Sequence, residues 1–491
     1  AARFSAGSGE LAALLREQQD LLRRQNRLDM RLAAALGASD PTARAQAEPL
    51  RREREALGAR LNAIDATLRR DHRAYADLAD PQPLSVADTQ ALLAPNEAVV
   101  LPLVLDEATI LFAVSKTAAV WAVSPVPEAR LTADIAALRR QLDPARWQAS
   151  MMPFDRALSH RLYANLWAPL NVALKDKTQV FVVPTGPLTS FPFAVLVEDA
   201  PQGGPAGDGN PQALRQTAWL AKTHALVTLP SISSLKALRL YANKGSGTEP
   251  FAGFGDPALG GPTSSHPLIA GARSVAAVHR GANPDPAALR ELTPLPGTAG
   301  ELKALAKALG ASETTDVYLR ERATEARVKT TDLSRKLVIA FATHGLMAGD
   351  MGLGEPGLVF TPPGAASERD DGYLAASEAA RLDLRADWII LSACNTAAGD
   401  APGAKGLSGL ARAFFLAGAR SLLVSHWPVW DDAAGRITTA SVKDFQANPA
   451  QGRAEALRQA MLALMKDTSN PRYAHPAAWA PFVLVGEPRG N

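Results

Sequence analysis

The chain has very little of the chemistry on which disulfide-rich and metal-binding proteins depend. It contains one cysteine in 491 residues, which excludes an intramolecular disulfide and favours a reducing compartment, the cytoplasm. Its histidines show no metal-ligand spacing, so no metal is expected. It also lacks a phosphate-binding P-loop, a dinucleotide-binding Gly-x-Gly-x-x-Gly and a Gly-x-Ser-x-Gly elbow, and no organic cofactor is implied.

Long apolar runs and a strong excess of one charge are missing as well. No uncharged apolar run reaches membrane-spanning length and the amino end has no signal-peptide pattern, so we expect neither membrane insertion nor secretion. The net charge of +3 is too small to indicate a direct nucleic-acid partner. Because the chain begins without methionine, we expect it to be a fragment of a longer protein. Its length and its 47% hydrophobic residues are typical of two or three globular units.

The first 80 residues carry a helical pattern. Leucines recur at three- and four-residue steps on either side of Asp40-Pro41, which predicts an antiparallel helical hairpin over residues 1–80. Arginine pairs such as Arg23-Arg24 and Arg51-Arg52 decorate the hairpin. They form either a solvated face or a docking surface for a regulatory protein partner.

Two α/β units are predicted to follow, over residues 81–245 and 246–491. In the first, strand-like runs at 99–101, 110–114 and 179–183 accompany a helical stripe from Leu131 to Leu142. Pro184 stands at a strand end where a catalytic residue would be placed. The second unit begins with a strand at 251–257 and contains the chemically notable residues.

Two buried-strand patterns of the second unit each end at a chemically notable residue. Residues 337–342 lead to His344-Gly345, and residues 388–391 lead to Cys394, the only cysteine. Parallel neighbouring strands would place both side chains at one sheet edge, where open α/β sheets bind ligands. A lone cysteine is often a small buried hydrophobe, but a thiolate nucleophile requires a neighbouring imidazole of this kind.

The order of the pair and its spacing agree with a known class of peptidase. The histidine precedes the cysteine by about fifty residues, as in caspases, although the local caspase signature around the cysteine is absent. Further motifs accompany the pair in a fixed order. They are Ala342-Thr343-His344-Gly345, Leu391-Ser392-Ala393-Cys394-Asn395-Thr396, residues 409–419 (GLARAFFLAGA), Trp427-Pro428-Val429 and residues 479–486 (WAPFVLVG).

This series resembles the motifs of CHAT-domain proteins, which are bacterial caspase-like cysteine peptidases related to separase and often follow tetratricopeptide repeats. The resemblance covers roughly residues 90 to 490. It implies a caspase-like α/β sandwich, with a mostly parallel sheet flanked by helices, in which 81–245 is a pseudo-caspase half and 246–491 the active peptidase half. It also implies a cysteine endopeptidase that acts on protein or peptide substrates and is regulated by a partner or by the N-terminal helices.

Within this resemblance, Cys394 is the expected nucleophile and His344 the expected proton carrier. The N–H groups of Gly345 and Cys394 are the expected oxyanion donors. His426 also follows a strand and is the weaker candidate for the base.

Several alternatives stay open. Asp256, Asp400 and Asp431 are candidate substrate-pocket carboxylates that would favour Arg or Lys, or they are ordinary caps of turns and helices. The glycine-rich segment 349–372 is either a gating loop or a hairpin without a role. The whole chain is alternatively a catalytically silent interaction module or a thiol-dependent acyl transferase, since both classes keep the same residues.

Overall fold

The computed structural model describes residues 47–71, 83–147, 150–241, 247–261, 285–346, 355–367, 369–392 and 409–489, with single positions between 14 and 40 and at 351 and 353. The chain divides into two compact units, Ala1–Gln82 and Pro83–Asn491. Among the described residues, no helix is both long and apolar enough to cross a membrane.

The first unit is a helical hairpin with a small core of its own. Its second helix is α4 (Ala47–Asp71), and described positions of the preceding segment, such as Leu21 and Leu28, are also helical. Leu28 and Ala35 pack against α4 through Leu50 and Leu57. Three ion pairs link the two segments: Glu17 with Arg60, Arg24 with Glu53, and Asp29 with Arg54. Because Glu17 pairs with the later residue Arg60, whereas Arg24 and Asp29 pair with the earlier residues Glu53 and Arg54, the two segments run antiparallel.

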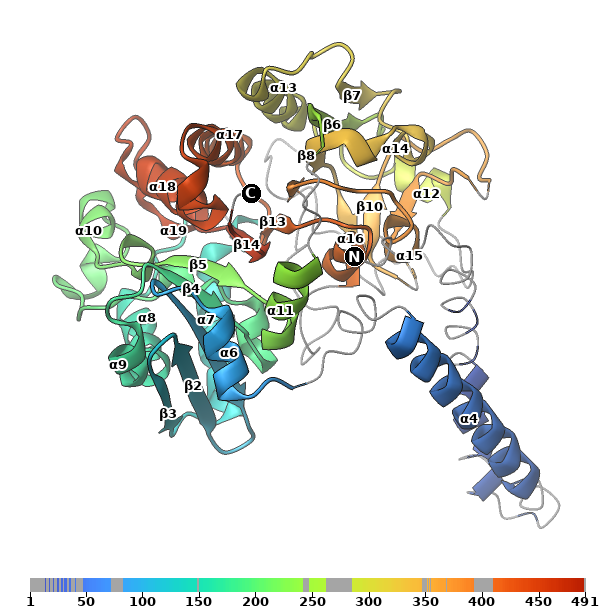
Figure 1. Cartoon of the computed structure of the whole chain (residues 1–491). Helices are drawn as coiled ribbons and strands as arrows, with labels where there is room; N and C mark the ends of the chain where they lie inside the picture. The colour runs from blue at the N-terminus through green and yellow to red at the C-terminus, as the bar shows by residue number, and fades with distance from the viewer. Residues whose placement is uncertain are drawn as a thin grey trace. The chain divides into compact units, whose positions relative to one another are not determined.

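The second unit is built on one sheet of eleven strands, in the order β3-β2-β1-β4-β5-β14-β13-β12-β8-β6-β7 (Figure 1). The strands are β1 (Glu97–Val104), β2 (Thr109–Ser115), β3 (Ala119–Ser124), β4 (Gln179–Val182), β5 (Ala225–Thr228), β6 (Glu249–Pro257), β7 (Val317–Arg320), β8 (Lys336–Ala342), β12 (Trp388–Leu391), β13 (Ser421–Ser425) and β14 (Phe482–Gly486).

Most pairings in this sheet are parallel. The exceptions are β1 with β2, β2 with β3, and β13 with β14. The C-terminal strand β14 inserts between β13, to which it is antiparallel, and β5, to which it is parallel. A strand from the end of the chain therefore joins the strands of 81–245 to those of 246–491 in one continuous sheet. The predicted class, a mostly parallel sheet flanked by helices, is confirmed.

Helices cover the sheet because its central strands are apolar on both faces, as in other parallel sheets. They are α6 (Val86–Leu92), α7 (Glu128–Leu142), α8 (Arg156–Leu166), α9 (Asn171–Leu174), α10 (Pro211–Gln216), α11 (Ile232–Tyr241), α12 (Pro286–Arg290), α13 (Gly297–Leu309), α14 (Glu325–Thr330), α15 (Ala376–Ala379), α16 (Gly409–Leu416), α17 (Asp431–Ala447), α18 (Arg453–Lys466) and α19 (Pro476–Trp479).

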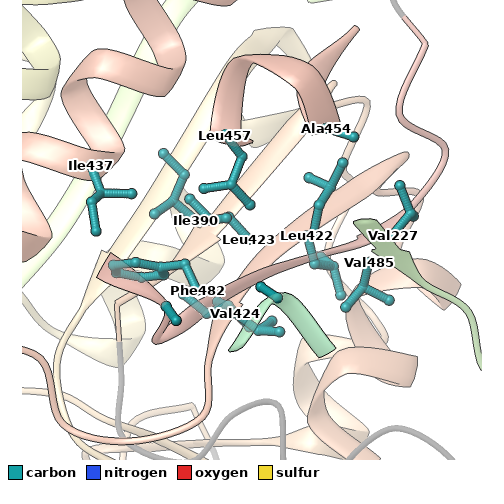
Figure 2. Close-up of a cluster of buried hydrophobic side chains, with 14 of the residues drawn as sticks. Val227, Ile390, Leu422, Leu423, Val424, Ile437, Ala454, Leu457, Phe482 and Val485 are labelled. Atoms are coloured by element: carbon teal, nitrogen blue, oxygen red, sulfur yellow. The ribbon is translucent and has the colours of Figure 1, made fainter. Parts of the chain in front are cut away.

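The hydrophobic core follows the middle of the sheet. Figure 2 shows side chains of β12, β13, β14 and β5 beside Ile437 of α17 and Leu457 of α18. All four residues of β12 and all five of β13 are buried. This packing fixes the strands that lead to the predicted catalytic residues, and burial at this level stabilises each large side chain by about 1.5–3 kcal/mol.

A second, smaller sheet follows His344. It has three short antiparallel strands, β9 (Gly345–Leu346), β10 (Gly357–Val359) and β11 (Tyr373–Ala375), in the order β11-β10-β9. The described part of segment 349–372 therefore contributes a strand to a small sheet, and its residues 349, 350, 352, 354 and 368 lie outside the described residues.

Candidate active site

The strands that precede the two predicted catalytic residues are direct neighbours. β12 pairs with β8 in parallel, and the register places Leu391 opposite Phe341. The pairing continues past the end of the strand, because the N–H of Ser392 donates to the carbonyl of Phe341 over 3.0 Å. His344 thus follows the end of β8, and Ser392 lies at the end of β12, two residues before the cysteine in the sequence. Cys394 itself lies outside the described residues.

The imidazole of His344 is buried and held by a main-chain carbonyl. Its Nε2 lies 2.7 Å from the carbonyl oxygen of Thr293, which can only accept a hydrogen bond. Nε2 therefore carries the proton, and in the neutral ring Nδ1 keeps the lone pair. Burial lowers the pKa of His344, although the bond to Thr293 acts in the opposite direction. At neutral pH the ring is a neutral base with a defined tautomer.

The second histidine, His426, follows β13 on the other side of β12. Burial, together with the neighbouring Arg139 cation, holds the pKa of His426 well below its ordinary range. Its Nδ1 has no hydrogen-bond partner among the described residues, whereas its main-chain N–H and carbonyl bind Pro481 and Arg139. Both histidines flank β12. A hydrogen bond to a main-chain carbonyl orients the ring of His344, whereas Nδ1 of His426 has no such partner among the described residues.

A buried carboxylate lies beside the end of β12. The Ser392 hydroxyl donates to Oε2 of Glu301 over 3.0 Å, and the Thr438 hydroxyl donates to Oε1 over 3.2 Å. Glu301 belongs to α13 and Thr438 to α17, so one side chain connects two helices to the segment that leads to Cys394. Burial raises the pKa of Glu301 to about 7, although both hydroxyl donors lower it.

The predicted pocket carboxylates lie in different surroundings. Asp256, at the end of β6, has a φ of 43° and forms an ion pair with Arg320 at 3.4 Å. Burial raises the pKa of Asp256, and Arg320 opposes this shift. Asp431 begins α17, where partial burial and the neighbouring Asp432 raise its pKa. Asp400 lies outside the described residues.

Asp431 and Glu301 both line a groove of about 750 Å³ between α13, α17 and α18. Its lining includes small residues, among them Gly297, Gly300 and Gly435. A Cβ atom on Gly297 would lie 1.7 Å from Oδ2 of Asp431, so only glycine allows this approach of helix and carboxylate. The carboxylate of Asp431 has no ion-pair partner among the described residues. Since Glu301 also binds Ser392, the groove lies next to the segment that leads to Cys394.

Thr293 and Glu301 were not predicted from the sequence. Thr293 acts through its main-chain carbonyl, and no side-chain pattern identifies such a role. Glu301 had a signal: it shares the α13 face of Leu305 and Leu309, at four-residue steps, so an acidic residue stands within a buried apolar stripe. A carboxylate at such a position requires hydrogen-bond partners, which Ser392 and Thr438 supply.

The chain is similar to known proteins over part of its length or more. Residues 156–487 match the CHAT domain family. A mouse (Mus musculus) protein, Tetratricopeptide repeat protein 28, is 34% identical over 113 residues, which are 23% of this chain and 4% of that protein. A Saccharomyces cerevisiae separase–securin crystal structure aligns with a TM-score of 0.45 and 9% identity over 82% of this chain and 31% of that chain. A second crystal structure of that complex aligns with a TM-score of 0.36 and 11% identity over 94% of this chain and 27% of that chain. The chain thus spans less than a third of each of these relatives.

The fold and the adjacent strand ends define an α/β protein with a mostly parallel sheet flanked by helices. The match over more than half of its length shows that the chain belongs to the CHAT domain family.

Proposed function

We propose that this chain is a cysteine endopeptidase in which Cys394 and His344 form the catalytic dyad. The observation that carries the proposal is the orientation of His344. Its Nε2 proton is bound to the Thr293 carbonyl, and this leaves Nδ1 free of a proton and able to accept one from a thiol. The parallel pairing of β8 with β12 supports the proposal, because the segment with Cys394 then begins beside the end of the histidine strand.

The proposed reaction uses only residues of this chain. The Cys394 thiol gives its proton to Nδ1 of His344, and its sulfur attacks the peptide carbonyl. The N–H groups of Gly345 and Cys394 stabilise the negative charge on the carbonyl oxygen. The imidazolium then protonates the leaving amine, and water hydrolyses the thioester to release a new carboxyl terminus and restore the thiol.

For specificity, we propose that a carboxylate binds an Arg or Lys side chain of the substrate. Asp431 fits this role best because it is unpaired among the described residues and lines an open groove beside Glu301 and Ser392. Asp256 is the second candidate, although its carboxylate already pairs with Arg320. Asp400 stays a third candidate on its sequence position alone.

We also propose that 81–245 acts as a pseudo-caspase half and that the helices of 1–80 respond to a regulatory protein partner. The shared sheet supports a mechanical link between the two halves, since β14 lies between β13 and β5. In the first half, Pro184 follows β4, which runs antiparallel to β8 in the sheet, so Pro184 lies at the edge opposite to that of His344.

The test is cleavage of a proteome-derived peptide library by the chain beside its Cys394→Ala and His344→Ala variants, read by mass spectrometry of new termini. We expect new carboxyl termini with the chain and a loss of at least about 100-fold in either variant, the usual range for acid–base and nucleophilic groups. New amides or esters would instead identify an acyl transferase. Cleavage that persists in Cys394→Ala, or a folded chain whose Cys394 resists an electrophilic peptide probe, would contradict the proposal.

The same library tests the pocket. Arg or Lys before the cut should dominate with the chain, and Asp431→Asn should lose this preference while its cleavage of neutral sites continues. Asp256→Asn is the matched control, and a preference that disappears only in this second variant would move the pocket to Asp256.

A further inference from the structure

One edge of the large sheet is apolar and uncharged. β3 is the outermost strand, and the described residues include no strand paired with its outer side (Figure 1). Its sequence, Ala119–Ser124, contains neither a charge nor a proline, the usual devices that keep edge strands from pairing. Trp121 and Val123 are 68% and 56% exposed.

The exposed side chains form one continuous patch. The register aligns Phe112 with Trp121, and Ile110 with both Leu103 and Val123, so these side chains share a face of the β1-β2-β3 meander. We call Leu103, Phe112, Trp121 and Val123 the edge patch. Phe112 and Leu103 are each 37% exposed. Val120 and Ala122, on the opposite face, pack against the core. The exposed apolar side chains of the meander thus lie on one face, and the most exposed of them are on the outer strand.

The backbone of β3 has free hydrogen-bonding groups at alternate residues. The N–H of Ser115 donates to the carbonyl of Ala118 across the β2-β3 turn, so this is a hydrogen-bonded pair. In an antiparallel ladder such pairs alternate with non-bonded pairs. Ala119, Trp121 and Val123 therefore direct both their N–H and carbonyl groups away from β2, toward the open edge.

We propose that this edge pairs with the β3 edge of a second copy of the chain, antiparallel about a two-fold axis at Trp121. The bonding pattern is self-complementary. Ala119 would face Val123 of the second copy and Trp121 would face its own equivalent, so that all three outward residues of each strand are bonded. The two indole rings would lie side by side, which removes apolar surface from water.

The charges around the edge are also complementary under this symmetry. Lys116 lies in the exposed turn between β2 and β3, and Asp106 and Glu107 lie in the exposed turn between β1 and β2, at the opposite end of the meander. Antiparallel pairing brings the lysine end of each copy to the carboxylate end of the other. No like charges meet along the strands themselves. Because β3 itself carries no charge and the charges at its two ends are opposite, a second copy fits this edge better than a charged peptide.

The test is the mass of the whole chain in solution by light scattering and sedimentation. We expect twice the chain mass for the natural sequence and for Val172→Lys, a control on α9, which contacts β2 and β3 and whose Val172 is 84% exposed. Trp121→Lys/Val123→Lys should halve the mass without changing the circular dichroism, because both side chains are exposed. A single-chain mass for the natural sequence, or a dimer that survives the double substitution, would overturn the proposal.

A cross-link tests the register independently. In a Cys394→Ser background, a single Trp121→Cys would place two thiols on the axis with Cα atoms about 5.5 Å apart, within disulfide range. Ala119→Cys is the matched control, since it would lie about 14 Å from its own equivalent. Oxidation should give a covalent dimer with the first variant only. Equal cross-linking of both, or of neither, would contradict pairing at Trp121.

Discussion

At the scale of single residues, the catalytic proposal depends on how one imidazole is held. His344 receives its orientation from a carbonyl about fifty residues earlier in the chain, at Thr293. This acceptor belongs to the main chain, and every amino acid has the same carbonyl. Substitution of Thr293 therefore leaves the hydrogen-bond acceptor of His344 in place. The neutral ring, with the proton on Nε2, is the form that a thiol requires as a base.

Glu301 gives a prediction about stability and pH. Its pKa rises from an ordinary 4.5 to about 7 on folding because the carboxyl is buried. The folded chain therefore binds a proton that the unfolded chain releases between these two values. The stabilisation is complete below pH 4.5 and is lost as the pH rises to about 7, and the shift corresponds to about 3 kcal/mol.

Urea unfolding of the chain and of Glu301→Gln at pH 5 and pH 8 measures this contribution. We expect the free energy of unfolding of the natural chain to fall by about 2.5 kcal/mol more than that of the variant over this interval, since glutamine does not titrate. Glu325, whose pKa burial also raises to about 7, titrates in both proteins and cancels in the comparison. Equal pH dependence of the two proteins would mean that Glu301 ionises normally in the fold.

At the scale of elements, the C-terminal strand depends on a buried arginine. Arg453, at the start of α18, is fully buried. Its guanidinium donates to the carbonyls of Glu487 and Arg489, which follow β14, and pairs with Asp387, which precedes β12, at 3.4 Å. Burial lowers the pKa of Arg453 to about 10, so the group stays charged at neutral pH.

We predict that Arg453→Ala lowers the free energy of unfolding by about 3 kcal/mol, because it removes a buried cation and leaves two carbonyls without their donor. Arg436→Ala is the control. Arg436 pairs with Asp467 on the surface, where its side chain is 52% exposed, and its loss should cost below about 1 kcal/mol. Denaturant unfolding of both variants checks the difference, and similar losses would contradict a special role for Arg453.

The strands were predictable where a short apolar run and the residues that bound it both indicate a strand. The apolar runs at β8 and β12 are short, end at small residues and lie next to each other as parallel strands, as predicted. The place of β14 was not predictable, because its run of five residues does not show that it returns between β13 and β5. The partners of Glu301 and His344 also come from distant segments, and contacts of this kind leave no periodicity in the sequence. Cys394 and Asp400 stay predictions.

At the scale of the whole molecule, the two units have separate cores. Among the described residues, the apolar clusters of the hairpin contain only residues of that unit, such as Leu28, Leu50 and Ile64. The large core of the second unit begins at Leu93 and likewise contains only residues of that unit. A unit with its own core is expected to fold alone.

We therefore predict that a chain lacking residues 1–82 folds. Its thermal unfolding midpoint should equal that of the second unit in the full chain. Calorimetry of both proteins checks this, and a shift of more than a few degrees would show that the hairpin stabilises the second unit.

Cleavage of the same library by both proteins then tests the proposed regulation. If the hairpin relays a partner's binding, the rate should respond to that partner in the full chain and not in the truncated one. Equal cleavage rates for the full and the truncated chain, each with and without the partner, would assign the hairpin a role other than control of the active site.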